Sequence, residues 1–254
     1  MVKVLAVVPA RMGSQRIPRK NALEIEHGLS LAQHAVDCAL WSGACDRIVV
    51  STDDPAALPI RDALVSLRPE ALATGTADIA SVVRHELACA EANGARYDYC
   101  VTLQPAVLSR SPLIVSKLVR AVVNERAGGG LTMCPVHPWI WTAKDGMLSA
   151  PWLPGPYPRS QDSGRMWQEI NAVQVASAEA VRAGKRWAGP LAVIDLPGWA
   201  SVLDVDTPED LAAARDIWPW AKPRLASWEG AVRVLPVGGY KIAEASNKDE
   251  CRSA

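Results

Sequence analysis

The chain has 254 residues, a formal net charge of zero, 49% hydrophobic residues and 21% charged residues. This balance is sufficient for a buried core, excludes global disorder, and argues against broad binding to nucleic acid or to a membrane surface. No apolar run is long enough to span a bilayer, and the short apolar N-terminal stretch lacks a cleavage site, so we expect a cytoplasmic protein.

Along the first half of the chain, short buried strands alternate with helices. The predicted strands are residues 3–8, 47–51, 99–103 and 131–135, and the predicted helices are residues 29–41, 55–66, 78–93 and 112–125. A long polar, basic loop at residues 9–28 follows the first strand. Because this alternation is typical of parallel βαβ units, we expect an α/β fold, Rossmann-like and three-layered, with helices on both faces of a doubly wound sheet.

The second half departs from this pattern at residues 136–170, which are rich in Pro, Trp and Gly and show no long period. We expect an irregular excursion there, with a small hairpin. Further strands are predicted at 172–176 and 191–195, and a helix from about Pro208 to Ile217. The pattern weakens after Pro219. We therefore expect one domain over residues 1–218 and a C-terminal extension over 219–254, partly disordered, with a short strand at 232–235.

The loop after the first strand carries the clearest chemical motif, PARMGSQRIPRKN at residues 9–21. Ligands of open α/β sheets bind at the carboxyl ends of the strands. Gly13 and Ser14 allow backbone amides to approach phosphate oxygens closely. The loop also supplies the positive charge that a triphosphate needs, from Arg11, Arg16, Arg19 and Lys20. A solvated basic loop is the alternative, but the position after the first strand favours a phosphate site.

Acidic residues, rather than cysteine or histidine, supply the predicted metal site. The six cysteines form no CxxC pair, and the four histidines show no metal-ligand spacing. Asp204 and Asp206 point the same way if their segment is extended, and two such carboxylates can hold Mg²⁺ against phosphate oxygens. In the alternative, Asp206 only caps the following helix and Asp204 is merely exposed. The basic loop at residues 9–21 favours metal binding.

The motif PARMGSQRIPRKN resembles the N-terminal signature of the acylneuraminate cytidylyltransferase family, which includes CMP-sialic acid, CMP-pseudaminic acid and, more distantly, CMP-KDO synthetases. That signature is a strand ending in Pro-Ala-Arg, then Gly-Ser-Lys, then Ile-Pro-x-Lys-Asn. The resemblance continues at spaced points over most of residues 3–217. These points are residues 49–54, 68–73, 103–105 with Arg110, Asn171 with Ala172, and 204–210. It implies a nucleotide-diphospho-sugar transferase fold whose excursion mediates homodimerisation.

The resemblance also implies the reaction: a nucleotidyltransferase that moves CMP from CTP to the anomeric hydroxyl of an acidic, sialic acid-like sugar, releasing pyrophosphate with Mg²⁺ as cofactor. By the same resemblance, Arg11 and Lys20 are the catalytic residues that bind the phosphates of CTP, while Asp204 and Asp206 bind Mg²⁺. The implied nucleotide- and substrate-binding residues are Ala10, Gly13, Ser14, Gln15, Asn21, Arg68, Ala77, Gln104, Arg110, Arg159 and Gln161. The implied partners are CTP, the acidic sugar and a second copy of the chain.

The sequence departs from the family's pattern in three places. Gln15 replaces a lysine, residues 106–109 read Ala-Val-Leu-Ser in place of Thr-Ser-Pro-Leu, and Ala172 replaces a glycine. These departures leave two alternatives open. One is a cytidylyltransferase that acts on a different anionic acceptor. The other is a nucleotide-binding protein that has lost catalysis, against which the presence of Arg11, Lys20 and both aspartates argues.

Overall fold

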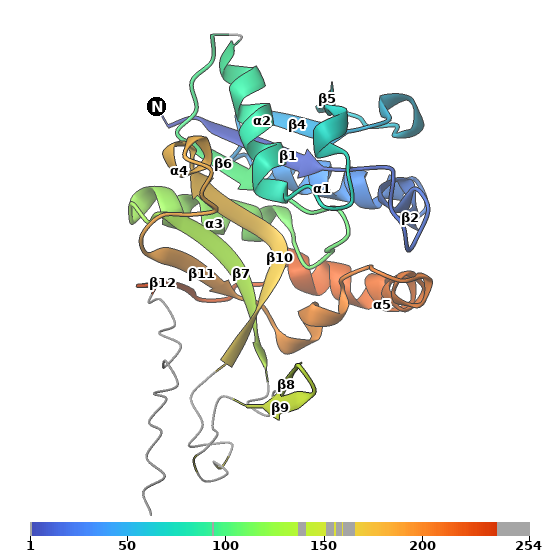
Figure 1. Cartoon of the computed structure of the whole chain (residues 1–254), viewed down its shortest axis with the longest axis vertical. Coiled ribbons are helices and arrows are strands. Elements are labelled where there is room, and N and C mark those ends of the chain that lie inside the picture. Colours follow the sequence, from blue (N-terminus) through green and yellow to red (C-terminus); the bar gives the residue numbers. More distant parts are fainter. Residues whose placement is uncertain are drawn as a thin grey trace, which may run out of the picture.

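The computed structural model describes residues 2–92, 94–136, 141–150, 155, 159 and 166–237. Its central element is a sheet of eight strands in the order β12-β11-β7-β10-β6-β1-β4-β5 (Figure 1). The strands are β1 (Val4–Pro9), β4 (Arg47–Thr52), β5 (Leu64–Leu67), β6 (Tyr99–Thr102), β7 (Gly129–Val136), β10 (Met166–Ser177), β11 (Leu191–Asp195) and β12 (Val232–Leu235). Only β10 and β12 run antiparallel to their neighbours. The predicted α/β class is confirmed, with a sheet that is mixed rather than wholly parallel.

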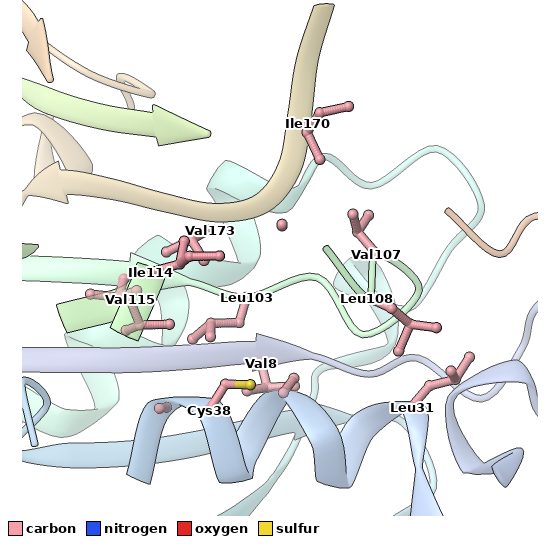
Figure 2. Packing of buried hydrophobic residues seen from close by; sticks show 14 of the residues in the cluster. Val8, Leu31, Cys38, Leu103, Val107, Leu108, Ile114, Val115, Ile170 and Val173 are labelled. Carbon is pink, nitrogen blue, oxygen red and sulfur yellow. The ribbon is translucent and has the colours of Figure 1, made fainter. Parts of the chain in front are cut away.

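Helices cover both faces of this sheet, which gives the predicted three layers. The helices are α1 (Leu31–Trp41), α2 (Ile79–Ala92), α3 (Pro112–Asn124), α4 (Ala178–Arg182) and α5 (Pro208–Ala226). Side chains of β1 alternate between the faces, as the pleat of a strand requires. Leu5 and Val7 pack in one cluster with α2 and α4, whereas Val8 packs in the other with α1, α3 and α5. Figure 2 shows Val8 and Cys38 within this second cluster.

The basic loop is more ordered than the sequence predicts. It contains a short 3₁₀ helix, η1 (Lys20–Ala22), and a small hairpin of β2 (Glu24–Glu26) and β3 (Leu29–Ser30). Further 3₁₀ turns are η2 (Pro55–Ala57), η3 (Glu70–Leu72) and η4 (Gly198–Val202). Helix α1 starts at Leu31, rather than at 29, because the Ser30 side chain accepts a hydrogen bond from the Gln33 amide and caps the helix.

The predicted helix at 55–66 is wrong. Asp54 caps a turn as expected, since its Oδ1 accepts a 3.1 Å hydrogen bond from the Ala57 amide. The turn ends after Ala57 because Pro59 disfavours helical geometry at the residue before it, and Leu58 is non-helical at φ −123° and ψ 85°. The chain then forms the edge strand β5, which pairs in parallel with β4.

The predicted end of the last helix near Ile217 is also wrong, because α5 continues to Ala226 through Pro219 and Pro223. Both prolines remove a backbone donor, but the helix persists since Trp218, Ala221 and Leu225 are at most 1% exposed and anchor it to the core. The expected boundary at residue 218 therefore falls inside α5. The predicted strand at 232–235 is confirmed as β12, the edge strand beside β11.

The excursion contains the expected hairpin, β8 (Thr142–Lys144) with β9 (Met147–Ser149). It is shorter than expected, because β10 begins at Met166 and pairs with β7 as far as Val136. Figure 1 shows this hairpin beyond the ends of β7 and β10. Among the described residues, no helix has the length and apolar character needed to cross a bilayer.

Candidate active site

The carboxyl ends of β1, β4 and β6 meet at one edge of the sheet, where a cavity of about 440 Å³ opens. We call it the basic cavity. The loop after β1 lines one side with Arg11, Ser14, Gln15, Arg16, Lys20 and Asn21, and the opposite side includes Arg68, Thr74, Gly75, Ala77 and Gln104. Four of these described side chains are cationic and none is a carboxylate. The electrostatic character of the cavity therefore suits a polyanion.

Internal hydrogen bonds hold the basic loop in place. The Met12 amide donates to Asp53 Oδ1 at 2.6 Å, and Asn21 Nδ2 donates to the Arg11 carbonyl at 2.7 Å. Arg11 itself reaches across the cavity mouth, where its NH1 donates to the Ala73 carbonyl at 3.2 Å. Ile17 is 6% exposed and anchors the middle of the loop in the core. Cationic side chains are thus presented by a backbone that is already ordered.

Lys20 connects the basic cavity to the late acidic segment, 186 residues away in sequence. Its Nζ donates to the Val205 carbonyl at 2.7 Å and to Asp206 Oδ1 at 3.0 Å. Arg16 contacts the same carboxylate oxygen at 3.0 Å. Lys20 lies in a confined position, since its side chain is 13% exposed against 64% for Arg16. The predicted phosphate-binding lysine and the predicted metal-binding aspartate therefore lie side by side.

Asp206 does not cap α5, so the capping alternative is wrong. Thr207 is the cap: its hydroxyl accepts from the Asp210 amide, and the Asp210 carboxylate accepts from the Thr207 amide at 2.8 Å. The Asp206 side chain is thereby left to face Lys20 and Arg16.

Asp204 sits next to this pair on a short extended segment, where the Val205 amide donates to the Ala106 carbonyl at 3.0 Å. Partial burial raises the pKa of Asp204, and the nearby negative charge of Asp206 raises it further. The two carboxylates repel each other, and a bound cation would relieve this repulsion. Mg²⁺ fits such a pair because it prefers oxygen ligands and keeps several water or phosphate ligands. Within the described ranges no group of three acidic, histidine or cysteine side chains forms a complete metal cage.

A second cavity of about 410 Å³, the adjoining cavity, shares Ile79 and Gln104 with the first. It lies over β6 and β10, and its polar lining includes Asn171, Gln174 and Lys185. Gln174 Nε2 is buried and has no hydrogen-bond partner among the described residues. The site can thus hold two molecules in contact across Gln104.

The sequence did not identify Gln174, Lys185 and Arg186 as site residues. Arg186 NH2 donates to Asn171 Oδ1 at 3.1 Å and pairs with Glu169, which fixes one wall of the adjoining cavity. In the sequence, Lys185 and Arg186 stand out only because they follow Gly184 directly, and Gly184 has a φ of 70° just after the end of α4. A glycine at that position indicates the end of a helix and not a binding site.

Several predicted site residues do not line either cavity. Ala10 is fully buried, with its amide bonded to the Ser51 carbonyl, and Gly13 faces the Asp53 side chain. Arg110 is 1% exposed because its guanidinium turns inward to backbone carbonyls. Direct contact of Ala10 or Arg110 with substrate is therefore not supported by their positions. Arg159 lies exposed in the excursion, and Gln161 falls outside the described residues.

Arg68 lines the basic cavity, but its guanidinium donates its hydrogen bonds to groups of the protein itself. Its NH2 donates to the Ser51 carbonyl at 2.8 Å and its Nε to the Ser51 hydroxyl at 3.2 Å, while NH1 reaches the Leu72 carbonyl. Burial lowers the pKa of this arginine. Arg68 thus ties the 68–77 loop to β4 and contributes charge to the cavity wall.

The three departures from the family's pattern have unequal consequences. Gln15 lines the basic cavity, so the missing lysine charge is lost at the site itself. Of residues 106–109, Ala106 alone lines either cavity, while Val107, Leu108 and Ser109 are buried. Ala172 is fully buried, and its side chain lines neither cavity. The change at residues 106–109 therefore acts on the site through one side chain.

Known proteins are similar to this chain in sequence and in fold. The chain matches the family described as Cytidylyltransferase over residues 5–124. CMP-N,N'-diacetyllegionaminic acid synthase of Legionella pneumophila is 29% identical over 83% of this chain and 94% of its own. 3-Deoxy-manno-octulosonate cytidylyltransferase of Aeromonas salmonicida is 31% identical over 56% of this chain and 52% of its own.

Solved structures agree with this fold. CMP:2-keto-3-deoxy-manno-octonic acid synthetase complexed with CTP superposes with a TM-score of 0.63 at 17% identity, over 86% of this chain and 99% of its own. For 4-diphosphocytidyl-2C-methyl-D-erythritol synthase the TM-score is 0.59 and the identity is 20%, with the same coverage of both chains. Sequence and fold together define a nucleotidyltransferase. The match to the Cytidylyltransferase family over residues 5–124, together with the similarity to these relatives, confirms the resemblance of the basic loop.

Proposed function

We propose that this chain transfers CMP from CTP to the anomeric hydroxyl of an acidic, nonulosonic-type sugar and releases pyrophosphate. The observation that carries the proposal is the basic cavity, with four cations and no carboxylate in its lining, directly beside the adjoining cavity and its amide and ammonium groups. The names of relatives support the acceptor class, since they include a CMP-N,N'-diacetyllegionaminic acid synthase and an N-acylneuraminate cytidylyltransferase.

CTP would occupy the basic cavity with its triphosphate on the loop after β1. Arg11, Arg16 and Lys20 all line this cavity and provide charge-assisted donors. The nucleoside would extend toward Gly75 and Ala77 on the opposite wall. A Cβ added at Gly75 would lie 3.5 Å from Gln15 Nε2, so the two walls approach each other closely there.

The acceptor sugar would occupy the adjoining cavity, with Gln104 between the two substrates. Gln174 brings an unpaired amide nitrogen, and Lys185 brings an ammonium group that makes no ion pair with a described residue. A carboxylate on the sugar would satisfy both groups. This placement sets the anomeric hydroxyl toward the basic cavity.

In the reaction, the anomeric oxygen forms a bond to the α-phosphorus of CTP, and the bond from that phosphorus to the β-phosphate oxygen breaks. The departing pyrophosphate takes the electron pair, and the hydroxyl proton is lost to solvent. The protein's residues orient the two substrates in line and neutralise charge as pyrophosphate forms. Mg²⁺, when held by Asp204 and Asp206, would supply additional positive charge at the phosphates.

If the two substrates occupy separate cavities, two lysine variants should affect different kinetic constants. Lys185→Gln is expected to raise the KM for the acidic sugar about tenfold, by loss of one ion pair, and to leave the KM for CTP nearly unchanged. Lys20→Gln is expected to raise the KM for CTP and lower kcat. Steady-state kinetics with each substrate varied in turn measures both effects. A rise in the KM for CTP alone in Lys185→Gln would contradict the placement of the sugar.

We infer that the protein acts as a homodimer through its excursion. The β8–β9 hairpin presents Met147 and Leu148 at 73% and 66% exposure, and Trp141 beside it at 50%. Such clustered exposed apolar residues are typical of an interface. Met147→Lys combined with Leu148→Lys should convert a dimer into a monomer at micromolar concentration in sedimentation-equilibrium runs, whereas Leu64→Lys on β5 should not. A monomeric unmodified chain would contradict the inference.

We also propose that the reaction takes place in the cytoplasm. Within the described part of the chain, Cys38, Cys45, Cys100 and Cys134 form no disulfide, as expected for a reducing compartment.

A further inference from the structure

Strand β10 is irregular where it passes the adjoining cavity. Its pairing with β7 jumps from Ile170 to Gln174. Their partners, Thr132 and Leu131, are consecutive on β7, so residues 171–173 have no partner on that strand. Figure 2 shows the ribbon of β10 turning in this stretch. We call residues 171–173 the β10 bulge. Bulges of this kind are frequent beside active sites, because the extra residues redirect a side chain.

The β10 bulge contributes one polar residue to the adjoining cavity. Asn171 is partly exposed and lines the cavity, whereas Ala172 and Val173 are at most 1% exposed and pack in the core. Arg186 NH2 donates to Asn171 Oδ1 at 3.1 Å, which orients the amide group of Asn171. The path of the backbone through the bulge therefore decides where Asn171 stands in the cavity wall.

The Thr132 hydroxyl holds the β10 bulge from the side of β7. Thr132 is fully buried, and its Oγ1 donates to the Ile170 carbonyl and accepts from the Val173 amide at 3.4 Å. A hydroxyl offers one donor and two acceptor positions, so a single side chain satisfies both backbone groups. The residue before the bulge and the last residue of the bulge are thereby tied to one residue of β7.

Arg110 holds the β10 bulge from the side of β6. That strand ends at Thr102, which pairs with Gln174, so its ladder stops short of the bulge. Arg110 NH1 instead donates to the Ala172 carbonyl at 2.8 Å, and its NH2 donates to the Gln104 carbonyl at 2.7 Å. Since Gln104 lines both cavities, the bulge is connected to the wall that the two substrates would share.

We propose that Thr132 is a positioning residue for the acceptor sugar, a role that rests on the proposed transfer of CMP. Thr132 lines neither cavity and acts through the backbone of the bulge. Without its hydroxyl, the Ile170 carbonyl and the Val173 amide would lose a buried partner, and the bulge would shift to pair them elsewhere. Asn171 would move with the bulge, and the acceptor sugar would lose its alignment with the α-phosphorus of CTP.

The test compares Thr132→Val, which removes the hydroxyl at nearly constant shape, with Thr132→Ser, which keeps it. Steady-state kinetics uses whichever of the sialic, pseudaminic, legionaminic and KDO acids the unmodified chain accepts, and amide hydrogen exchange follows Val173. Thr132→Val should lower kcat/KM for the acid at least about tenfold and change the KM for CTP less than about twofold. It should also speed exchange of the Val173 amide. Thr132→Ser should stay within about threefold of the unmodified chain in each kinetic constant.

Val36→Ala is the stability control, because Val36 is fully buried on α1 in the same core and lines neither cavity. It should lower the melting temperature and leave kcat/KM for the acid unchanged. If Thr132→Val does not fold, Thr132→Cys decides by the same criteria, since its thiol is a weak donor and a weak acceptor.

Two results would overturn the role of Thr132 and leave the transfer of CMP standing. In the first, Thr132→Val changes the kinetics no more than Val36→Ala does. In the second, Thr132→Ser loses as much activity with the acid as Thr132→Val. Absence of transfer by the unmodified chain would instead contradict the transfer itself, and the role of Thr132 with it.

Discussion

Asp206→Asn is expected to lower kcat/KM for CMP transfer by about 10²–10³-fold, equivalent to about 3–4 kcal/mol of lost transition-state stabilisation. The change removes one of two carboxylates available to Mg²⁺ and also the charge that Lys20 and Arg16 contact. The fold should persist, because Asp206 is half-exposed and Thr207 caps α5 independently of it. Loss of the Asp206 charge should in addition lower the raised pKa of Asp204.

Initial rates of pyrophosphate release, measured over a range of Mg²⁺ concentrations, provide the readout. The variant should need more Mg²⁺ for half-maximal rate, and it should melt within a few degrees of the unmodified chain. Asp216→Asn serves as the control, because Asp216 is an exposed carboxylate on the same helix. Unchanged kcat/KM and unchanged Mg²⁺ dependence in folded Asp206→Asn protein would remove Asp206 from the metal site.

Arg110→Met is expected to lower the free energy of unfolding by about 2–4 kcal/mol. The Arg110 guanidinium donates to the carbonyls of Gln104, Pro105 and Ala172, and the methionine would leave these buried acceptors unpaired. Relief from burying a charge offsets part of this loss, since burial already lowers the pKa of Arg110 to about 10. For a domain of this size the melting temperature should fall by about 5–15 °C.

Thermal and urea unfolding of Arg110→Met measure this effect directly. Arg120→Met is the matched control, because Arg120 is exposed on α3 and should shift the stability by about 0.5 kcal/mol or less. A melting temperature for Arg110→Met that equals that of the control would show that the three carbonyls find other partners. Arg110 then would not be what holds Gln104 and β10 together.

Local patterns in the sequence predict much of this fold. The strand at 191–195 has its predicted bounds, because a short run of apolar residues is bounded by Gly189-Pro190 and Pro197. Arg11, Gln15 and Lys20 line the basic cavity as expected, since the loop after the first strand of an open α/β sheet lies at the ligand-binding edge. Element type and the nucleotide loop are thus encoded in consecutive residues.

The remaining features depend on contacts between distant segments. The contact between Lys20 and Asp206 and the inward turn of Arg110 arise only when β6, β10 and α5 are packed together. Gln174 and Lys185 join the adjoining cavity because β10 runs antiparallel between β6 and β7, a strand order that no local pattern specifies. Tertiary packing likewise overrides the weak helix propensity of Pro219 and carries α5 onward to Ala226.

The most direct test of the proposed activity is pyrophosphate release from CTP and Mg²⁺ across sialic, pseudaminic, legionaminic and KDO acids, with ATP, GTP and UTP as controls. We expect release with CTP and one nonulosonic acid, and little with the other nucleotides. No release from CTP with any of these acids, under conditions where CTP binds to the chain, would contradict the proposed transfer.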